Sequence, residues 1–295
     1  MAEKPVRGIA PVERLLERLL REWKPDAVVC TYMVYPYMLD SLASRTGRAV
    51  PYLTVVTDSF VINKSWLCSK SPLWAVTDPW TRAIMEEKGL PQDRLRVTGF
   101  PVNPVLGALA KEHPLSWKEG EPFRVLYFAQ RSARHARAEL AGMLDANPAL
   151  HVTCILGRRF RRIYPRIRDL RARYGRRLTV RGWTRRVPSY LAASHVVVGK
   201  AGGATVHEVL AAARPMLVNF LLPGQEEGNT RLLEKLGGGG HVPDVRALAS
   251  ALQEMMADGG AQWRRMHENL LRAGMTGGSG RIADLALKLA EEHTN

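Results

Sequence analysis

The sequence predicts an α/β protein made of two doubly wound, Rossmann-like domains, and three observations predict this fold class. A chain of 295 residues is long enough for two domains of ordinary size. Short β-branched and apolar runs alternate with helical patterns along most of the chain. The segment "KEHPLSWKEGEP" (111–122) is polar, contains prolines and lacks periodicity, which is typical of a linker. We therefore expect one domain over residues 1–112 and another over residues 113–295.

The N-terminal domain is expected to begin with an amphipathic helix, because the apolar residues of "VERLLERLLREW" (12–23) recur at i, i+3, i+4 and i+7. A helical stretch ends at about Arg45, and a later helix opens with Asp78 as N-cap and Pro79 at its first position. Strand-type runs lie at residues 27–31, 52–58, 73–78 and 94–99. Because doubly wound domains usually begin with a strand, we expect this domain to be incomplete, with a segment missing before Met1.

The C-terminal domain shows a longer series of strands and helices. Its strand candidates lie at residues 123–129, 151–156, 177–182, 195–199, 215–220 and near His241. Continuous apolar strands belong in a parallel sheet that helices cover on both faces. Six such strands predict a complete doubly wound domain.

The composition is that of a globular protein with a strong basic charge. The formal net charge is +15, and much of it comes from residues 157–186, where arginines surround a single acidic residue, Asp169, at spacings that put them on several faces of a helix. This segment is either a solvated helix or a surface for an anion such as a lipid, a nucleic acid or a phosphorylated small molecule. No apolar run is long enough to cross a bilayer and no signal peptide is evident, so we expect a cytoplasmic protein.

The spacing of the cysteines predicts neither a zinc site nor a disulfide framework. Cys30, Cys68 and Cys154 are far apart, with no C-x-x-C pair and no histidine pattern near them. We expect three reduced thiols in the core and no bound metal.

The stretch "GKAGGATVHE" (199–208) predicts an anion site. A strand that ends at Gly199, followed by Gly202, Gly203 and a helix, directs unpaired backbone N–H groups and a positive helix end at a ligand. Glycine keeps side chains away from that ligand and permits positive φ. The alternative is a tight βα turn whose glycines serve only helix-to-sheet packing.

A second polar segment follows one βα unit later. The next strand leads into a loop over residues 223–229, and neighbouring parallel strands would bring both loops to the carboxyl edge of the sheet, where ligands of such sheets bind. Glu208, about one turn into the first helix, would accept hydrogen bonds from ribose hydroxyls, or else only complement the helix dipole. Gln225, Glu226 and Asn229 are either hydroxyl-binding groups or ordinary loop and cap residues.

These residues carry a family resemblance. The segment "GKAGGATVHEVLAAARPMLVNFLLPGQEEGN" resembles the donor site of the glycosyltransferases related to monogalactosyldiacylglycerol synthase, processive diacylglycerol glucosyltransferases and, more distantly, MurG (glycosyltransferase family 28). "VVTDSF", Trp66, "GLPQDRLRVTGFPVNP" and "RGWTRRVPSYLAASHVVVGKAGG" follow the order and spacing of the family, so the resemblance covers nearly the whole chain. It implies a GT-B fold, in which two Rossmann-like domains face a cleft, with the last helix crossing back to the N-terminal domain.

The resemblance also implies roles for individual residues. The donor would be a UDP-sugar, which is a co-substrate rather than a cofactor, and the acceptor a lipid such as diacylglycerol. Glu208 would bind ribose, Asn229 would brace the sugar loop, and Asp58 is the remaining candidate for a catalytic base. The other donor-site candidates are the diphosphate contacts Gly202, Gly203 and Thr205, the uracil neighbours Trp183 and Thr184, the loop residues Pro223 and Gly224, and the sugar contacts Gln225 and Glu226.

The sequence departs from the family pattern at three places. The usual N-terminal glycine-rich segment, whose histidine is the candidate base, is absent. Gln130, Arg131 and Ser132 stand where relatives have a glycine-rich turn, so Arg131 or Ser132 would contact phosphate in its place. Asn63 stands where a histidine is common.

The resulting expectation is an inverting hexosyltransferase that attaches peripherally to the anionic inner face of the plasma membrane, through its basic charge and the region "WLCSKSPLWAVTDPW" (66–80). One alternative is a catalytically incomplete UDP-sugar-binding subunit that needs a partner chain. Two further alternatives are an arginine-rich nucleic-acid binder, which the lack of RNA-binding signatures disfavours, and a nucleotide-sugar epimerase. Neither the sugar, the lipid nor the oligomeric state follows from the sequence.

Overall fold

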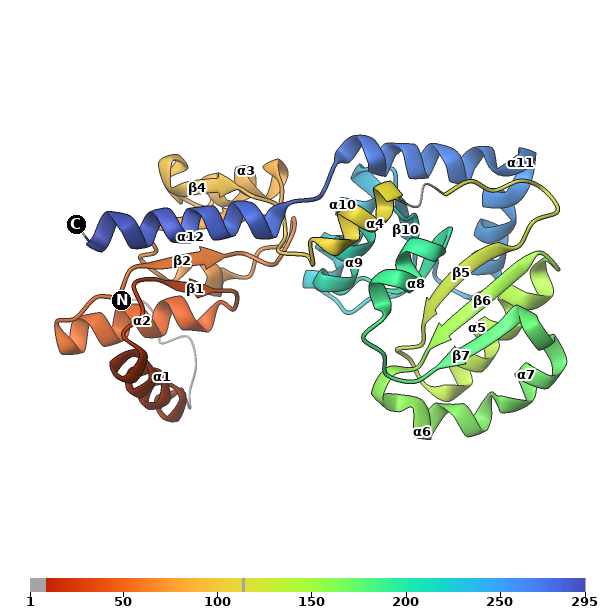
Figure 1. Cartoon of the computed structure of the whole chain (residues 1–295), viewed down its shortest axis with the longest axis horizontal. Helices are drawn as coiled ribbons and strands as arrows, with labels where there is room; N and C mark the ends of the chain where they lie inside the picture. Colours follow the sequence, from red (N-terminus) through yellow and green to blue (C-terminus); the bar gives the residue numbers. More distant parts are fainter. Residues whose placement is uncertain (1–8, 113–114, 295) are drawn as a thin grey trace. The chain divides into compact units, whose positions relative to one another are not determined.

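The structure of the chain, a computed structural model, describes residues 9–112 and 115–294 (Figure 1). The chain folds into two compact units. The first contains the described residues up to Pro101 and those from Gly277 onward, and the second contains the described residues from Val102 to Thr276. The units therefore separate at Pro101 and Gly277, rather than in the segment 111–122 that composition suggested.

That segment belongs to the second unit because its apolar side chains are used there. Trp117 is buried, its indole lies edge-on to Phe123 with 5.3 Å between ring centroids, and its Nε1 donates to the carbonyl of Glu121. Residues 113 and 114 of the expected linker lie outside the described residues.

The described residues of the first unit form a four-stranded parallel sheet with strand order β1-β2-β3-β4. The strands lie in the four predicted runs, and Asp78 caps α3 as predicted, its carboxylate accepting from Thr81 N at 2.8 Å. In chain order, the elements are α1 (Ala10–Trp23), β1 (Val28–Cys30), α2 (Val34–Thr46), β2 (Tyr52–Val55), η1 (Lys64–Leu67), β3 (Leu73–Val76), α3 (Pro79–Glu87), η2 (Gln92–Arg94), β4 (Leu95–Val97) and α12 (Gly278–Thr294).

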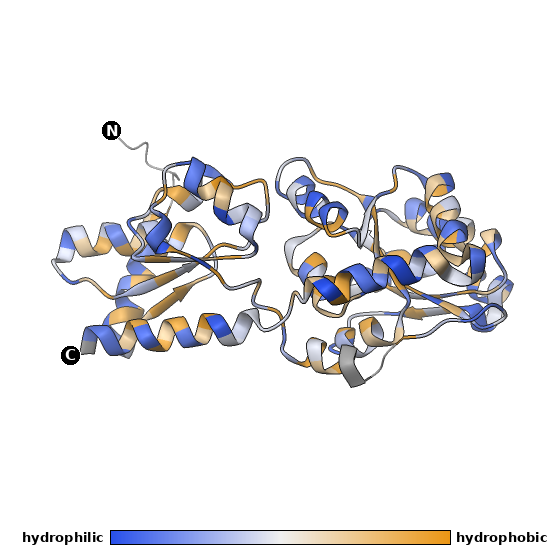
Figure 2. Cartoon of the chain, turned by 90° about the horizontal axis from the view of Figure 1, so that it is seen from above, coloured by the Kyte–Doolittle hydropathy of each residue, from blue (hydrophilic) through white to orange (hydrophobic). Residues whose placement is uncertain are grey.

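The last helix, α12, packs on the sheet of the first unit, as the resemblance implied. Ile282 and Leu289 are buried against Leu53, Val55 and Ala75 of β2 and β3. Hydrophobic and hydrophilic residues alternate along α12 in Figure 2, as expected for a helix with one buried side. This contact explains why residues 277–294 return to the first unit.

The described residues of the second unit form a six-stranded parallel sheet with strand order β10-β9-β8-β5-β6-β7. All six strands lie in or next to the runs predicted from sequence. In chain order, the elements are α4 (Val105–Glu112), β5 (Phe123–Phe128), α5 (Ala133–Ala146), β6 (Leu150–Ile155), η3 (Gly157–Arg159), α6 (Phe160–Ile163), η4 (Tyr164–Arg166), α7 (Arg168–Tyr174), η5 (Gly175–Arg177), β7 (Leu178–Arg181), α8 (Val187–Ala193), β8 (Val196–Lys200), α9 (Gly203–Ala211), β9 (Met216–Phe220), α10 (Gln225–Lys235), β10 (Gly239–His241) and α11 (Val245–Ala273).

Helices cover this sheet (Figure 1): α5 packs against α11, whereas α4 packs against α8 and α9. The chain winds outward from β5 through β6 to β7 and, after crossing back, outward from β8 through β9 to β10. The order therefore reverses between β5 and β8, which is the topological switch point where ligands of open α/β sheets bind.

The arginine-rich segment is not one helix, so this expectation was wrong. Residues 157–177 form the short helices α6 and α7, with the 3₁₀ turn η3 before α6, η4 between the two helices and η5 after α7. Pro165 lies in the middle of η4, and Gly157 and Gly175 have φ of +56°, a conformation that interrupts an α-helix. The expectation of three core thiols was also wrong in part, because Cys68 is exposed while Cys30 and Cys154 are buried.

Two buried histidines predict acid sensitivity. Burial lowers the pKa of His195 and His207 to about 3, and Arg124, whose Nη2 lies 3.2 Å from His195 Nε2, also disfavours the charged form of His195. These folded-state pKa values lie below that of an unfolded histidine, which is about 6.5, so the free energy of unfolding should be greatest above pH 6.5. As the pH is lowered below 6.5, the free energy of unfolding should decrease by up to about 1.4 kcal/mol per pH unit for each imidazole.

Urea denaturation at pH 7.5, 6 and 5 measures this slope. The variant His241→Gln, at an exposed position on β10, should show the same slope as the wild type. A free energy of unfolding that does not change between pH 7.5 and 5 would contradict the assignment.

Candidate functional site

Three loops meet at the carboxyl edge of the six-stranded sheet, around the switch point. They follow β5, β8 and β9, and β8 pairs in parallel with β5 on one side and with β9 on the other. Gln130, just after β5, bridges two of these loops: its Oε1 accepts a hydrogen bond from Lys200 N, at the end of β8, at 3.2 Å. The sequence prediction that the loops after β8 and β9 share one edge is therefore confirmed.

The turn from β8 to α9 presents bare backbone, as the sequence predicted. Gly202 is the N-cap residue of α9 and provides no side-chain hydrogen bond to the N–H groups of the first turn. Its φ is −67°, so the expectation that the turn permits positive φ does not explain this glycine. A Cβ at Gly202 would stand 3.4 Å from Lys200 Nζ, which is an ordinary contact, so neither the backbone conformation nor packing within the described residues requires glycine at this position.

Glu208 lies one turn into α9, on the open side of the helix. Thr205 and Glu208 are three residues apart and both half-buried, whereas Val206, His207 and Val209 form the buried side. Burial raises the pKa of the Glu208 carboxyl. Within the described residues, this carboxylate has neither a hydrogen-bond nor an ion-pair partner, so its oxygen atoms are available to a ligand.

The polar segment after β9 differs from the expected loop. Pro223 and Gly224 are in the loop, and Gly224 has φ of +94°, but α10 begins directly afterwards. Gln225, Glu226 and Asn229 are therefore helical residues rather than loop residues. The positive φ at Gly224 makes the chain turn sharply enough for the helix to begin there.

Glu226 is buried and already has partners in the protein. Its carboxylate forms a short ion pair with Lys200 Nζ and accepts from Leu222 N at 2.9 Å. Lys200 thus connects the loops after β8 and β9, a role that sequence reasoning missed. The signal was present, since Lys200 directly precedes the bare turn in "GKAGG".

Asn229 ties α10 to the same turn. It is fully buried, and its Nδ2 donates to the carbonyl of Ala201 at 2.9 Å. Its Oδ1 is buried without a hydrogen-bond partner among the described residues. Asn229 therefore holds the turn and α10 in fixed positions relative to each other.

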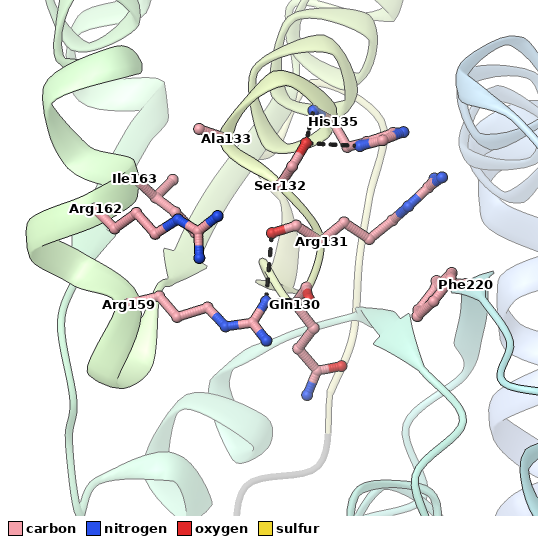
Figure 3. A pocket seen from close by; sticks show the side chains of 9 residues that line it. All are labelled: Gln130, Arg131, Ser132, Ala133, His135, Arg159, Arg162, Ile163 and Phe220. Atoms are coloured by element: carbon pink, nitrogen blue, oxygen red, sulfur yellow. Dashed lines mark hydrogen bonds between the residues drawn. The ribbon is translucent and has the colours of Figure 1, made fainter.

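The residues in place of the usual glycine-rich turn lie at the N-terminus of α5. Ser132 is its N-cap, with Oγ 2.8 Å from His135 Nδ1, and also accepts from His135 N. Arg131 forms an ion pair with Glu139 at 3.3 Å, and its guanidinium lies 5.3 Å from the centre of the Phe220 ring. Arg131, Ser132, His135 and Phe220 line a hollow of about 390 Å³ (Figure 3).

Trp183 and Thr184 follow β7 at the same edge. Because β7 lies three strand positions from β8, it is separated from the bare turn by about 14 Å. The Trp183 side chain is exposed, with the Arg185 guanidinium 5.6 Å from its ring centre, and Thr184 Oγ1 accepts from Arg186 N at 3.0 Å. An exposed indole at this edge offers a flat apolar surface to a base.

Asp58 lies in the first unit and is buried. Its carboxylate accepts from Trp66 Nε1 at 2.8 Å. Trp66 and Trp74 are both buried in the core beside Met85, so the expectation that the region 66–80 offers tryptophans to a membrane was wrong for these two residues. Trp66 belongs to η1 and Trp74 to β3, so this packing holds η1 against the sheet.

Comparisons with known proteins find the group of glycosyltransferases that the sequence resembles. Residues 9–102 match the family model described as monogalactosyldiacylglycerol (MGDG) synthase. A processive diacylglycerol β-glucosyltransferase from Staphylococcus carnosus is 25% identical over 252 residues, which cover 84% of this chain and 63% of that protein. The corresponding protein from Bacillus subtilis is 24% identical over 285 residues, covering 95% of this chain and 73% of that protein. The chain thus spans between about three fifths and three quarters of these relatives.

Solved structures show the same fold at low identity. MurG from Acinetobacter baumannii has a TM-score of 0.66 and 15% identity, covering 98% of this chain and 82% of that one. The UDP-GlcNAc 2-epimerase from Neisseria meningitidis, solved bound to UDP-GlcNAc, has a TM-score of 0.68 and 13% identity, covering 97% and 83%. The chain therefore has a GT-B fold of two Rossmann-like units, and its resemblance to the glycosyltransferases related to MGDG synthase, the processive diacylglycerol glucosyltransferases and MurG is confirmed.

Proposed function

We propose that this chain is an inverting glycosyltransferase that transfers a hexose from a UDP-sugar to a lipid acceptor such as diacylglycerol. The observation that carries the proposal is Glu208, a half-buried carboxylate without a partner among the described residues, one turn into a helix whose bare N-terminus opens at the switch point. A carboxylate there fits ribose hydroxyls, and the N–H groups beside it fit a diphosphate. The names of the relatives support the acceptor class.

In this proposal the leaving group is stabilised by the protein itself. The N–H groups at Gly203 and the following residues of α9, together with the helix dipole, face the charge that develops on the departing diphosphate, so no metal or cofactor is required. Gln225 and Glu226 bind sugar hydroxyls, with Glu226 oriented by Lys200 and Leu222 N. Asp58, oriented by the Trp66 indole, is the candidate base that removes the acceptor proton.

A nucleotide-sugar epimerase is a second candidate, because the Neisseria epimerase is as similar in fold as MurG. The curated relatives favour the transferase, since they resemble this chain in sequence as well. The two reactions differ in one requirement, because an epimerase converts its nucleotide sugar without an acceptor.

The decisive experiment incubates the purified chain with UDP-sugars, with and without diacylglycerol in mixed vesicles. We expect a glycolipid and free UDP only when the lipid is present. Conversion of the nucleotide sugar without lipid would identify an epimerase, and UDP binding without transfer would favour a donor-binding subunit that needs a partner chain. Absence of both binding and turnover would refute the proposal.

We further propose that α1 contacts an anionic membrane surface. None of its residues is buried, and its exposed apolar residues Val12 (42%), Leu15 (45%) and Trp23 (74%) lie among exposed basic residues. Such a helix binds in the interface of a bilayer through apolar burial and charge. Among the described residues, no helix is long and apolar enough to span a membrane.

The double variant Leu15→Ser/Trp23→Ser should reduce co-sedimentation with vesicles that contain an anionic lipid by about 10-fold, because two apolar side chains no longer enter the bilayer. Binding of the wild type should also weaken as salt rises. Leu271→Ser, at another exposed leucine on α11, is the matched control and should not change binding. Binding that does not depend on salt, or an equal effect of the control, would contradict the proposal.

A further inference from the structure

A pocket rich in arginine lies between the N-terminus of α5 and α6 (Figure 3). Arg131, Arg159 and Arg162 line it, together with Ser132 and His135, and its volume is about 390 Å³. The lining contains no acidic side chain. It therefore combines several positive charges with the positive end of a 14-residue helix.

The three guanidinium groups differ in what they already bind. Arg131 is neutralised by Glu139 from outside the pocket. Arg159 is held in place by hydrogen bonds from its Nη1 to the carbonyls of Gln130 and Arg131, which are uncharged acceptors. Arg162 has no hydrogen-bond or ion-pair partner within residues 9–112 and 115–294. Two positive charges thus remain without a counter-charge, one of them in a fixed position.

The pocket adjoins the donor site but does not include its diphosphate cradle. It shares Gln130, Arg159 and Phe220 with a second hollow of about 550 Å³, which Lys200 and Leu222 line. Lys200 pairs with Glu226, one of the residues that we propose for the transferred sugar. Neither hollow is lined by Gly202, Gly203 or Glu208. An anion in the arginine pocket would therefore lie near the sugar end of the donor.

We infer that this pocket binds a carboxylate on the transferred sugar, so that the donor is a UDP-hexuronic acid. The inference rests on the proposed function, because it places the nucleotide at α9. A planar guanidinium matches a carboxylate with two parallel hydrogen bonds, and Arg159 is already oriented for such a contact. A neutral hexose would offer no counter-charge to Arg159 or Arg162.

Calorimetric titration with UDP, UDP-glucose and UDP-glucuronate tests the inference. The wild type should bind UDP-glucuronate at least about 10-fold more tightly than UDP-glucose, as expected for one charge-assisted contact. Arg162→Met should remove most of this preference and leave the affinities for UDP and UDP-glucose within about twofold of the wild type. Arg161→Met, at the adjacent arginine of α6, which does not line the pocket, is the matched control and should keep the preference.

Each other outcome overturns the inference in a distinguishable way. No preference for UDP-glucuronate in the wild type, or an unchanged preference in Arg162→Met, shows that the pocket does not bind the sugar carboxylate. In either case UDP binding and the proposed function are unaffected. Equal weakening of all three ligands by Arg162→Met assigns the arginine to the diphosphate instead. Loss of preference in the Arg161→Met control shows a general effect of surface charge. If no nucleotide binds to the wild type, the proposed function fails and the inference fails with it.

Discussion

Replacing Glu208 with alanine is expected to weaken binding of a UDP-sugar by about 10- to 100-fold. A carboxylate that accepts hydrogen bonds from two ribose hydroxyls contributes about 1.5–3 kcal/mol, and alanine removes both acceptors. The fold should be unaffected, because the Glu208 carboxylate makes no hydrogen bond or ion pair to the described residues. Titration calorimetry measures the affinity, and thermal unfolding confirms that the variant is folded.

The matched control for this prediction is Glu254→Ala. Glu254 is exposed on α11 and its carboxylate accepts only from Ser250 among the described residues. We expect wild-type affinity in that variant. Burial raises the pKa of Glu208, and a protonated carboxyl accepts hydrogen bonds less well than a carboxylate. As the solution is acidified, the wild type should therefore lose affinity for the nucleotide at a higher pH than it would with an ordinary carboxylate. An affinity in Glu208→Ala equal to that of the wild type would remove the main support for a nucleotide site at α9.

Replacing Gly202 with alanine is expected to weaken UDP binding at least 10-fold without unfolding the protein. With φ of −67°, Gly202 has a backbone conformation that alanine adopts without strain. The added Cβ would stand 3.4 Å from the flexible end of Lys200, so the protein tolerates it. It would nevertheless occupy the space through which a phosphate reaches the backbone N–H groups of α9.

Gly280→Ala is the control for this prediction, because a Cβ at Gly280 meets no atom within 4 Å. Both alanine variants should melt within a few degrees of the wild type, and only Gly202→Ala should lose affinity for UDP. If Gly202→Ala binds UDP normally, the glycine serves helix packing alone, and the phosphate must bind elsewhere. Val at the same position, which fills more of the opening, should show a larger loss.

Local patterns predicted the secondary structure well where hydrophobic periodicity and caps agree. Asp78 followed by Pro79 predicted the start of α3, and the strands of the described residues lie in or beside the runs expected from the sequence. Patterns failed where the deciding interaction comes from elsewhere in the chain. The sequence placed Trp117 in a linker, whereas in the structure it packs against Phe123. The sequence placed Trp66 in a surface anchor, whereas in the structure it packs in the core and donates a hydrogen bond to Asp58.

Some elements of the candidate site could be predicted from the sequence, whereas others could not. The bare turn at Gly202 and Gly203 and the carboxylate of Glu208 follow from local sequence, since a strand, two glycines and a helix are sufficient to place them. The start of α10 at Gln225 did not follow, because it depends on the positive φ at Gly224. Lys200, Gln130 and Arg159 were missed as site residues, since their roles depend on partners 26 to 70 residues away in sequence.

The sequence by itself determined that this chain has two parallel α/β units and that β8 leads through Gly202 and Gly203 into α9, at the turn where we propose that a diphosphate binds. These features depend on interactions between residues close together in the chain: strand periodicity, capping and glycine turns. Only the tertiary structure decided that Trp117 is buried in the second unit, that Lys200 is paired with Glu226, and that Arg159 and Arg162 line one pocket. Packing and ion pairing join residues that the fold brings together from separate segments, and no local pattern records which of them will meet.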